Sequence, residues 1–269
     1  MALRFAVMGN PIAHSLSPFI HQRFAEQLGI ELSYEAIQVT DENRFASTVA
    51  DFFGRGGKGL NITLPYKEKA FALAARNSFA STKAKAANTL WMDEGKLHAD
   101  NTDGAGLLKD LANYCELKTK QVLLLGAGGA ARGVIGPLLA AGISQLVVVN
   151  RSPEKAFHLQ LDFPQIQCSP INDLKINFDL IINATSASLN SENLRLSASL
   201  LKPETLCYDL AYAKNGSTPF VNWAHSQGIV GVDGLGMLVE QAAESFYIWH
   251  GLRPDVRAVL AELKEGQND

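Results

Sequence analysis

Residues suited to acid–base chemistry follow a predicted strand early in this 269-residue chain. A short strand expected over 59–63 runs into the segment Asn61-Ile62-Thr63-Leu64-Pro65-Tyr66-Lys67, whose only strong cation is Lys67. A partly desolvated lysine can exchange a proton near neutral pH, and it can stabilise the alkoxide that forms when a hydride reaches a ketone. A lysine in a first helical turn can also be a solvated charge, so this segment alone leaves both interpretations open.

Asn88 and Asp103 bracket a predicted hairpin whose turn is the tetrapeptide Asp93-Glu94-Gly95-Lys96. This arrangement allows both side chains to converge on one ligand. An Asp103 carboxylate beside Lys67 would hold the lysine charged, and it would accept a hydrogen bond from a substrate hydroxyl. Because Asp103 also begins a predicted helix, N-capping is its structural alternative.

A third polar segment, Gly9-Asn10-Pro11-Ile12-Ala13-His14-Ser15-Leu16-Ser17-Pro18, comes directly after the first predicted strand. Open α/β sheets bind ligands at this carboxyl edge. Ser15 and Ser17 are two positions apart in an extended loop, so both hydroxyls can point at one carboxylate. The structural alternative is a simple helix start, because Ser17-Pro18 is an ordinary N-terminal pair.

A glycine-rich turn, Gly126-Ala127-Gly128-Gly129-Ala130-Ala131, follows a buried strand and opens a helix. This is the context of the dinucleotide-binding GxGxxG/A motif. Gly126 permits the tight turn, Gly128 lets the backbone approach a pyrophosphate, and Ala131 is the third small residue. The helix N-terminus then offers free N–H groups to phosphate. A glycine-rich turn that holds no ligand is the alternative.

The next predicted strand ends at Asn150-Arg151-Ser152, where an NAD-specific site usually has an acid for the ribose hydroxyls. Arg151 can pair with a 2′-phosphate, Ser152 can donate to it, and Lys155 lies one turn further on. The segment therefore favours NADP over NAD, unless Arg151 and Lys155 are ordinary solvated charges.

The rest of the pattern alternates strands and helices in two series. Strands are expected over 4–8, 33–39, 59–63, 88–92 and 97–99, and then over 121–125, 146–149, 180–182, 206–208 and 229–232. Helices are expected over 17–28, 42–53, 103–115, 130–141, 235–250 and 255–263. We predict an α/β fold with a first domain over 1–103, completed by the helices of 237–269, and a doubly wound, Rossmann-type domain over 104–236.

Composition excludes several functions. With 24 basic and 27 acidic residues, the chain has a formal charge of −3 and no excess of positive charge that would bind nucleic acid or anionic lipid. The three cysteines form no CxxC pair, and the first residues lack a secretory signal, so we expect a reducing, cytoplasmic location. The histidines and carboxylates show no ligand spacing, so no metal is expected.

Taken together, these segments closely resemble the shikimate dehydrogenase family over nearly the whole chain. Further stretches that carry the resemblance are Asn183-Ala184-Thr185-Ser186, Asp209-Leu210-Ala211-Tyr212, Thr218-Pro219 and Asp233-Gly234-Leu235-Gly236-Met237-Leu238-Val239-Glu240-Gln241-Ala242. The resemblance implies an NADPH-dependent oxidoreductase that interconverts 3-dehydroshikimate and shikimate in chorismate and aromatic amino acid biosynthesis. It also implies a substrate cleft between an N-terminal α/β domain with a mainly parallel sheet and an NADP domain.

The resemblance assigns roles to individual residues. Lys67 and Asp103 become the catalytic pair. Substrate contacts are Ser15, Ser17, Thr63, Lys67, Asn88, Asp103, Tyr212 and Gln241, with the two serines and Tyr212 on the carboxylate. Cofactor contacts are Gly126, Ala127, Gly128, Gly129, Ala130, Asn150, Arg151, Ser152, Lys155, Thr185, Leu210 and Gly234. The expected partner is a small molecule, and the chain is expected to be a monomer or a homodimer.

One stretch departs from the sequence typical of the shikimate dehydrogenase family. In this chain Ala84-Lys85-Ala86-Ala87 precedes Asn88-Thr89, and the family usually has a less basic stretch at this place. Two alternatives stay open. A quinate/shikimate dehydrogenase that accepts NAD would usually have a bulkier hydroxyl residue at Ser17 and an acid at Asn150. A catalytically silent NADP-binding paralogue would keep the fold alone, although every proposed catalytic position holds a chemically competent residue.

Overall fold

The computed structural model describes residues 2–185, 196–213 and 216–266. The chain divides into two compact units. Unit 1 comprises Met1–Gly106 and Val239–Glu262, and unit 2 comprises Leu107–Leu238 and Leu263–Asp269. These limits differ from the predicted ranges mainly at the C-terminus, since Leu263 onward belongs to unit 2. Within the described ranges, no helix has the length and apolar character needed to span a membrane.

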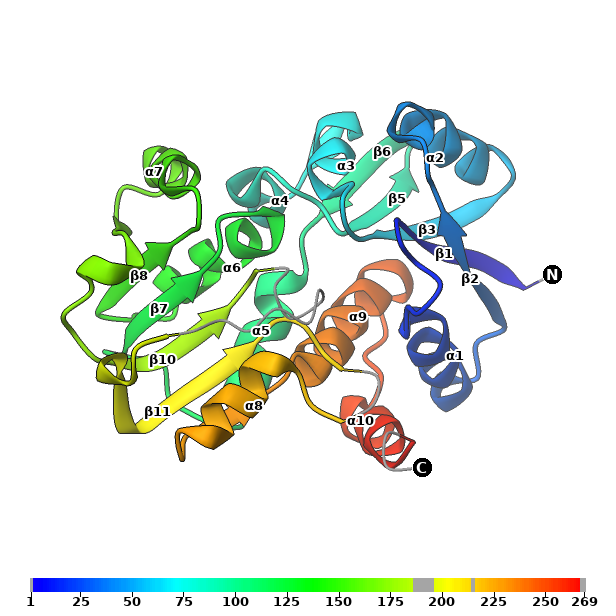
Figure 1. Ribbon diagram of the computed structural model, residues 1–269. Coiled ribbons are helices and arrows are strands. Elements are labelled where there is room, and N and C mark those ends of the chain that lie inside the picture. Colours follow the sequence, from blue (N-terminus) through cyan, green and yellow to red (C-terminus); the bar gives the residue numbers. More distant parts are fainter. Residues whose placement is uncertain (1, 186–195, 214–215, 267–269) are drawn as a thin grey trace. The chain divides into compact units, whose positions relative to one another are not determined.

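Unit 1 is built on a six-stranded mixed sheet (Figure 1). Its strand order is β2 (Leu32–Gln38), β1 (Leu3–Gly9), β3 (Gly57–Ile62), β5 (Thr89–Asp93), β6 (Lys96–Asp100) and β4 (Arg76–Asn77). The first three strands are parallel, and β5 and β6 form the predicted antiparallel hairpin. β2 and β3 lie on opposite sides of β1, so the chain leaves β1 and β3 in opposite directions along the sheet. The carboxyl ends of β1 and β3 therefore form a topological switch point, where such sheets bind ligands.

Helices cover both faces of this sheet. The helices of unit 1 are α1 (Ser17–Leu28), α2 (Phe45–Gly54), α3 (Lys67–Leu73) and α4 (Phe79–Ala84). Three further helices, α5 (Asp103–Leu111), α9 (Leu235–His250) and α10 (Val256–Glu265), cross the limits between the two units. Met8 of β1 belongs to a core cluster with Phe45 and Tyr66. On the other face Trp249 of α9 packs on Gly59, where a Cβ atom would lie 2.4 Å from the indole. The pleat of the strands thus gives each face its own core.

Unit 2 has a six-stranded sheet in which every pairing is parallel (Figure 1). The order is β12 (Val230–Val232), β11 (Leu201–Asp209), β10 (Phe178–Asn183), β7 (Gln121–Leu125), β8 (Gln145–Val149) and β9 (Gln167–Cys168). Its other elements are α6 (Gly129–Ala140), α7 (Pro153–Asp162), α8 (Pro219–Ser226), and the 3-10 turns Ile171–Asp173 and Ala198–Leu200. Counted from β7, the order is that of the Rossmann fold, which confirms the predicted doubly wound domain.

The apolar run of β7 explains why it is the central strand. Val122 and Leu124 lie in one core cluster with Leu138 of α6, whereas Leu123 and Leu125 lie in another with Phe220 of α8. A strand buried on both faces needs apolar residues at consecutive positions rather than at alternate ones.

Most predicted elements are confirmed, with errors at the ends of helices and strands and with several elements missed. The helices expected over 17–28 and 235–250 have these bounds in the structure. The helix expected over 42–53 begins as the 3-10 turn Glu42–Arg44, and α5 ends at Leu111 rather than at Cys115. Pro65 precedes α3, because Thr63–Tyr66 form a turn of their own before that helix begins. The elements α4, α7, α8, β4 and β9 were not among the predicted ones.

One buried residue of unit 1 is unusual. His21 of α1 is 0% exposed and stacks on Tyr34, with 4.4 Å between ring centroids. Burial, with a smaller contribution from the nearby His250, lowers the pKa of His21 to about 3. A side-chain hydrogen bond with Asn61 favours the charged ring, but it offsets only part of the effect of burial. The imidazole is therefore a neutral member of an aromatic cluster.

This burial predicts an acid-sensitive fold. The unfolded chain binds a proton at His21 below its ordinary pKa of about 6.5, whereas the folded chain binds it only near pH 3, so stability falls as pH drops between these values. We expect the loss caused by His21 to reach about 3 kcal/mol at pH 4.5. Denaturant unfolding at pH 7 and pH 4.5 should show this loss in the wild type and in the exposed control His158→Leu, but not in His21→Leu. A wild-type pH dependence in His21→Leu would contradict the prediction.

Candidate active site

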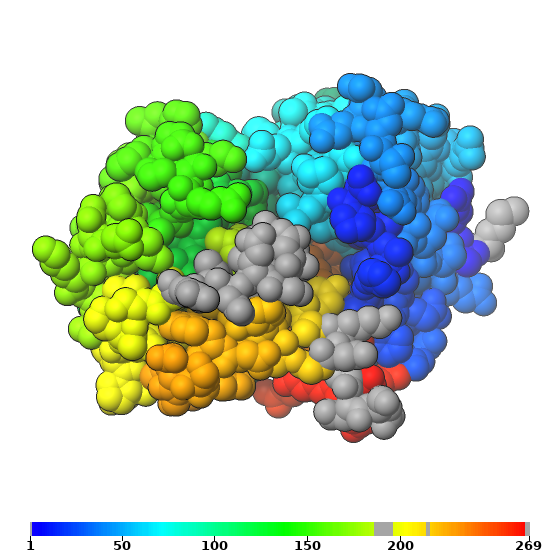
Figure 2. Space-filling model, in the orientation of Figure 1, coloured from blue at the N-terminus to red at the C-terminus, as the bar shows by residue number. Residues whose placement is uncertain are grey.

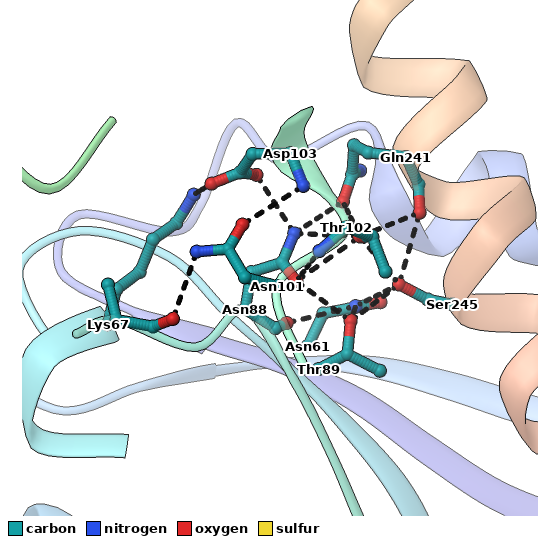
Figure 3. A network of polar contacts seen from close by, with 10 residues as sticks. Asn61, Lys67, Asn88, Thr89, Asn101, Thr102, Asp103, Gln241 and Ser245 are labelled. Carbon is teal, nitrogen blue, oxygen red and sulfur yellow. Dashed lines mark hydrogen bonds and ion pairs between the residues drawn. The ribbon is translucent and has the colours of Figure 1, made fainter. Parts of the chain in front are cut away.

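Lys67 and Asp103 form an ion pair in unit 1 (Figure 3). Lys67 is the first residue of α3, Asp103 is the first residue of α5, and Lys67 Nζ lies 2.6 Å from Asp103 Oδ2. The side chains are 15% and 6% exposed, respectively. The two residues that sequence reasoning paired are thus in contact, and little solvent screens their charges.

Asn88 holds the second oxygen of this carboxylate. The backbone N–H of Thr102 can only donate, and it lies 2.9 Å from Asn88 Oδ1, which fixes the orientation of the amide. Asn88 Nδ2 therefore faces Asp103 Oδ1 at 2.9 Å, and it also lies 3.1 Å from Gln241 Oε1. Asn88, Asp103 and Gln241, which lie far apart in the sequence, converge as predicted (Figure 3).

The stretch that departs from the family form is well packed. Ala86 and Ala87 are fully buried, and the backbone N–H of Ala87 donates to the carbonyl of Lys67 at 2.8 Å. Lys85 ends α4 with a left-handed φ of 49°. The loop thus supports the backbone that carries Lys67.

The loops after β1 and β3 lie together at the switch point of the unit 1 sheet. A Cβ atom on Gly9 would lie 2.4 Å from Thr63 Cγ2, so only glycine allows Thr63 to approach the β1 loop. Ser17 is 6% exposed and is the first residue of α1, with Leu16 at the N-cap position, so the helix start predicted at Ser17-Pro18 is present. Ser15 Oγ accepts from the Ser17 backbone N–H at 3.3 Å.

Tyr212, the eighth predicted substrate residue, belongs to unit 2. It is half-buried in the segment that follows β11.

The glycine-rich turn has the geometry that a pyrophosphate requires. Gly126 has a φ of +108°, and a Cβ atom there would lie 3.0 Å from the carbonyl carbon of Ala184. This contact joins the ends of β7 and β10, the switch point of the second sheet. Among the described residues, a Cβ atom on Gly128 or Gly129 would meet nothing within 4 Å, and no side chain caps the start of α6. Open space above uncapped helical N–H groups fits a bound phosphate group, and Ala127 and Ala130 lie on the same turn.

The segment after β8 also has the expected character. Arg151 and Lys155 are exposed, and Asn150 Nδ2 donates to the Ser152 carbonyl at 2.9 Å. The region from β8 to α7 forms part of the surface of unit 2 (green in Figure 2). Glu154 shares the first turn of α7, but it lies beyond the strand end where an NAD-specific acid is expected.

The three remaining predicted cofactor residues lie at the ends of neighbouring strands. Thr185 follows β10 and donates to Asn183 Oδ1, and Leu210 follows β11. Gly234 follows β12 and packs on the Leu210 carbonyl, 2.4 Å from where a Cβ atom would be. All three thus share the carboxyl edge of the sheet, and their role in binding stays a prediction. Ser186, quoted with Thr185 in the same motif, lies outside the described residues.

The structure adds residues that sequence reasoning did not select. Four buried residues are hydrogen-bonded to Asn88 or Gln241 of the predicted set: Asn61, Thr89, Thr102 and Ser245. The first three stand beside selected residues in the motifs. Ser245 lies four positions after Gln241 on one helix, and this spacing is the signal that could have revealed it.

The described histidines, cysteines and carboxylates bear on the predictions about metal binding and cysteine chemistry. The described part of the chain contains no group of three or more metal-ligating side chains. Cys115, Cys168 and Cys207 are free thiols, and burial raises the pKa of Cys207 to about 12.

Family models match most of the chain. Residues 7–90 match the shikimate dehydrogenase substrate binding domain, residues 107–222 match shikimate / quinate 5-dehydrogenase, and residues 234–264 match the shikimate 5′-dehydrogenase C-terminal domain.

Full-length relatives agree with these matches. The chain is 54% identical to shikimate dehydrogenase (NADP(+)) of Legionella pneumophila (strain Lens), with 98% of this chain and 99% of the relative covered. It is 47% identical to the protein of the same name from Dechloromonas aromatica (strain RCB), with 97% of each covered. The crystal structure of shikimate 5-dehydrogenase from Thermus thermophilus in complex with NADP(H) and shikimate superposes with a TM-score of 0.88. That pair is 36% identical over 98% of this chain and 99% of the other.

A mixed α/β unit with a buried Lys–Asp pair, joined to a Rossmann-type unit, is an arrangement typical of nicotinamide-dependent dehydrogenases. Together with these matches, it shows that the chain belongs to the shikimate dehydrogenase family.

The glycine turn generates a test with a matched control. Gly126→Ala adds a Cβ atom at a positive φ and against the Ala184 backbone, so we expect the Kd for NADP⁺ to rise about tenfold or more. Gly142→Ala has similar backbone strain at φ +79°, but its nearest neighbour is 3.9 Å away, beyond the other end of α6. We expect this control to lose stability and keep its Kd in calorimetric titration. Equal weakening in both variants would indicate a general effect of backbone strain.

Proposed function

We propose that this protein catalyses the reversible NADPH-dependent reduction of 3-dehydroshikimate to shikimate, with Lys67 and Asp103 as the catalytic pair. The observation that carries the proposal is the part-buried 2.6 Å ion pair between these residues. Asn88 holds the other oxygen of the Asp103 carboxylate, and the chain belongs to the shikimate dehydrogenase family. The reaction belongs to chorismate and aromatic amino acid biosynthesis.

The side chains of unit 1 define how the substrate is held. The Ser15 and Ser17 hydroxyls are suited to bind the substrate carboxylate, with Tyr212 as a third donor. Thr63, Asn88 and Gln241 are suited to bind the ring hydroxyls. In this arrangement the reacting oxygen lies next to Lys67 Nζ, the strongest donor of the group.

Lys67 and Asp103 then carry the proton. In the direction of reduction, the Lys67 ammonium donates a proton to the carbonyl oxygen and stabilises the negative charge that develops there. Asp103 fixes the position of Nζ and accepts a hydrogen bond from a neighbouring hydroxyl. In the oxidation direction the same pair accepts the proton. NADPH, when bound, supplies the hydride that reaches C3.

Residues of unit 2 are suited to hold the nucleotide. The Gly126–Ala130 turn and the start of α6 offer backbone N–H groups to the pyrophosphate. Arg151, Ser152 and Lys155 offer charge and hydrogen bonds to the 2′-phosphate, a group that NAD lacks. Thr185, Leu210 and Gly234 line the same sheet edge.

A broader dehydrogenase that also uses quinate or NAD is the second candidate, because the family model matched over 107–222 covers both substrates by its description. Ser17 and Asn150 argue against it, since they lack the bulk and the acidic charge that such enzymes are expected to have at these positions.

A substrate panel distinguishes the two candidates. Purified protein is mixed with shikimate or quinate, each with NADP⁺ or NAD⁺, and nicotinamide reduction is followed by absorbance. We expect turnover with shikimate and NADP⁺ only. Comparable turnover with quinate or NAD⁺ would favour the broader enzyme. No turnover in any mixture, with NADP⁺ still bound, would indicate a silent paralogue.

The catalytic role of Lys67 has a control on the same helix. Lys67→Ala removes the proton donor, so we expect kcat to fall by on the order of 10²-fold or more, with a smaller change in the Kd for shikimate. Lys69→Ala, two residues further along α3, removes an exposed lysine that pairs with Glu42 at 2.8 Å, and it should keep the wild-type kcat. Near-normal kcat in Lys67→Ala would exclude Lys67 from the mechanism.

A further inference from the structure

A chain of buried hydrogen bonds continues from the catalytic pair into the core of unit 1 (Figure 3). Asn61 of β3, Thr89 of β5 and Ser245 of α9 are 6%, 0% and 0% exposed. Ser245 Oγ lies 2.7 Å from Thr89 Oγ1 and 2.9 Å from Asn61 Nδ2. None of these three side chains was expected to contact the substrate, and all three are hydrogen-bonded inside the protein.

The chemistry of the partners fixes the direction of the first bonds. The backbone carbonyl of Asn88 can only accept a hydrogen bond, so the Asn61 side-chain atom that lies 3.1 Å from it is Nδ2. Asn61 Oδ1 therefore faces Tyr34 and accepts from its hydroxyl at 2.7 Å. The amide of Asn61 thus receives a hydrogen bond on one side and donates one to Ser245 on the other.

The same reasoning fixes the remaining bonds. Thr89 Oγ1 lies 2.9 Å from Asn88 Oδ1, which can only accept, so this bond uses the single hydroxyl proton of Thr89. In the 2.7 Å contact with Ser245, Thr89 is then the acceptor, and Ser245 shares its single proton between Thr89 Oγ1 and the backbone carbonyl of Gln241, 3.1 Å away. Asn88 continues the chain of hydrogen bonds, because its side-chain Nδ2 donates to Asp103 Oδ1 at 2.9 Å.

Every donor in this series points towards the catalytic carboxylate. The order is Tyr34, Asn61, Ser245, Thr89, Asn88 and Asp103, and Lys67 lies on the far oxygen of Asp103. At the other end, the Ser17 side chain hydrogen-bonds Tyr34. Aligned hydrogen bonds in a buried setting polarise one another, so each member orients the next more firmly than an isolated pair would.

We propose that Ser245 and Thr89 are positioning residues for this reaction. Their hydroxyl pair fixes the amide of Asn88, and through it the Asp103 carboxylate that holds Lys67. The proposal rests on the proposed function of Lys67 and Asp103. The hydroxyls do not touch the substrate, so their loss should slow the chemical step more than it weakens binding.

Thr89 offers the sharpest pair of variants. Thr89→Val keeps the shape and removes the hydroxyl, whereas Thr89→Ser keeps the hydroxyl and removes a methyl group. We expect Thr89→Val to lower kcat about tenfold with less than about twofold change in the KM for shikimate, and Thr89→Ser to recover most of that loss. An equal loss in both variants would show that packing, not the hydroxyl, matters, and would overturn the proposal.

Ser245 tests whether the two hydroxyls act as one chain. Ser245→Ala should reproduce the loss in kcat, and the double variant with Thr89→Val should be about as slow as either single variant, because the chain is already broken. Losses that multiply to about a hundredfold would mean independent effects and would overturn the proposal. Ser47→Ala is the control, since Ser47 of α2 is exposed and its hydroxyl also bonds a backbone carbonyl, that of Arg44, at 3.0 Å.

Two further measurements separate the possible failures. NADP⁺ affinity and Tm establish that each variant is folded, and the Thr89 pair remains decisive if Ser245→Ala does not fold. Wild-type activity on shikimate together with a defect in Lys67→Ala establishes the proposed function. If Ser245→Ala and Thr89→Val then turn over at the wild-type rate, the positioning role is overturned and the proposed function stands. An inactive wild type overturns both.

Discussion

Burial of the Asp103 carboxylate is the constraint on which the site in unit 1 depends. A carboxylate on a side chain that is only 6% exposed is costly unless both oxygens have partners. Lys67 supplies one partner and the Asn88 amide supplies the other. The amide is useful in only one orientation, because the reversed one would place its oxygen against the carboxylate. The backbone N–H of Thr102 and the Thr89 hydroxyl therefore matter as much as the ion pair itself.

The same architectural solution is used in both units. In each sheet the strand order diverges around one strand, and the loops after two neighbouring parallel strands form the binding edge. A glycine allows the two loops to meet in each case: Gly9 approaches Thr63 in unit 1, and Gly126 approaches Ala184 in unit 2. The first edge presents hydroxyl and cationic side chains, whereas the second presents backbone N–H groups. This difference fits a carboxylate-bearing polyol at one edge and a pyrophosphate at the other.

Local sequence was sufficient for much of the fold. The apolar period of α1, with Gly29 in the left-handed conformation at its end, placed that helix within its observed bounds. The continuous apolar run of β7 and the glycines after it identified the Rossmann-type unit. Elements without a long period escaped detection, because two residues of β4 cannot show a pattern.

The sequence by itself determined the features set by neighbouring residues: the turns, the glycine-rich backbone between β7 and α6, and the order of the polar motifs at strand ends. The tertiary structure alone decided which way the Asn88 amide points, and that Tyr34 and Ser245 contribute to the site. Ser245 is 184 positions from Asn61 and 156 from Thr89, yet it bonds both. The reason is physical: hydrogen-bond direction in a buried cluster depends on which donors and acceptors the packed strands and helices bring within about 3 Å. Local spacing does not specify that set.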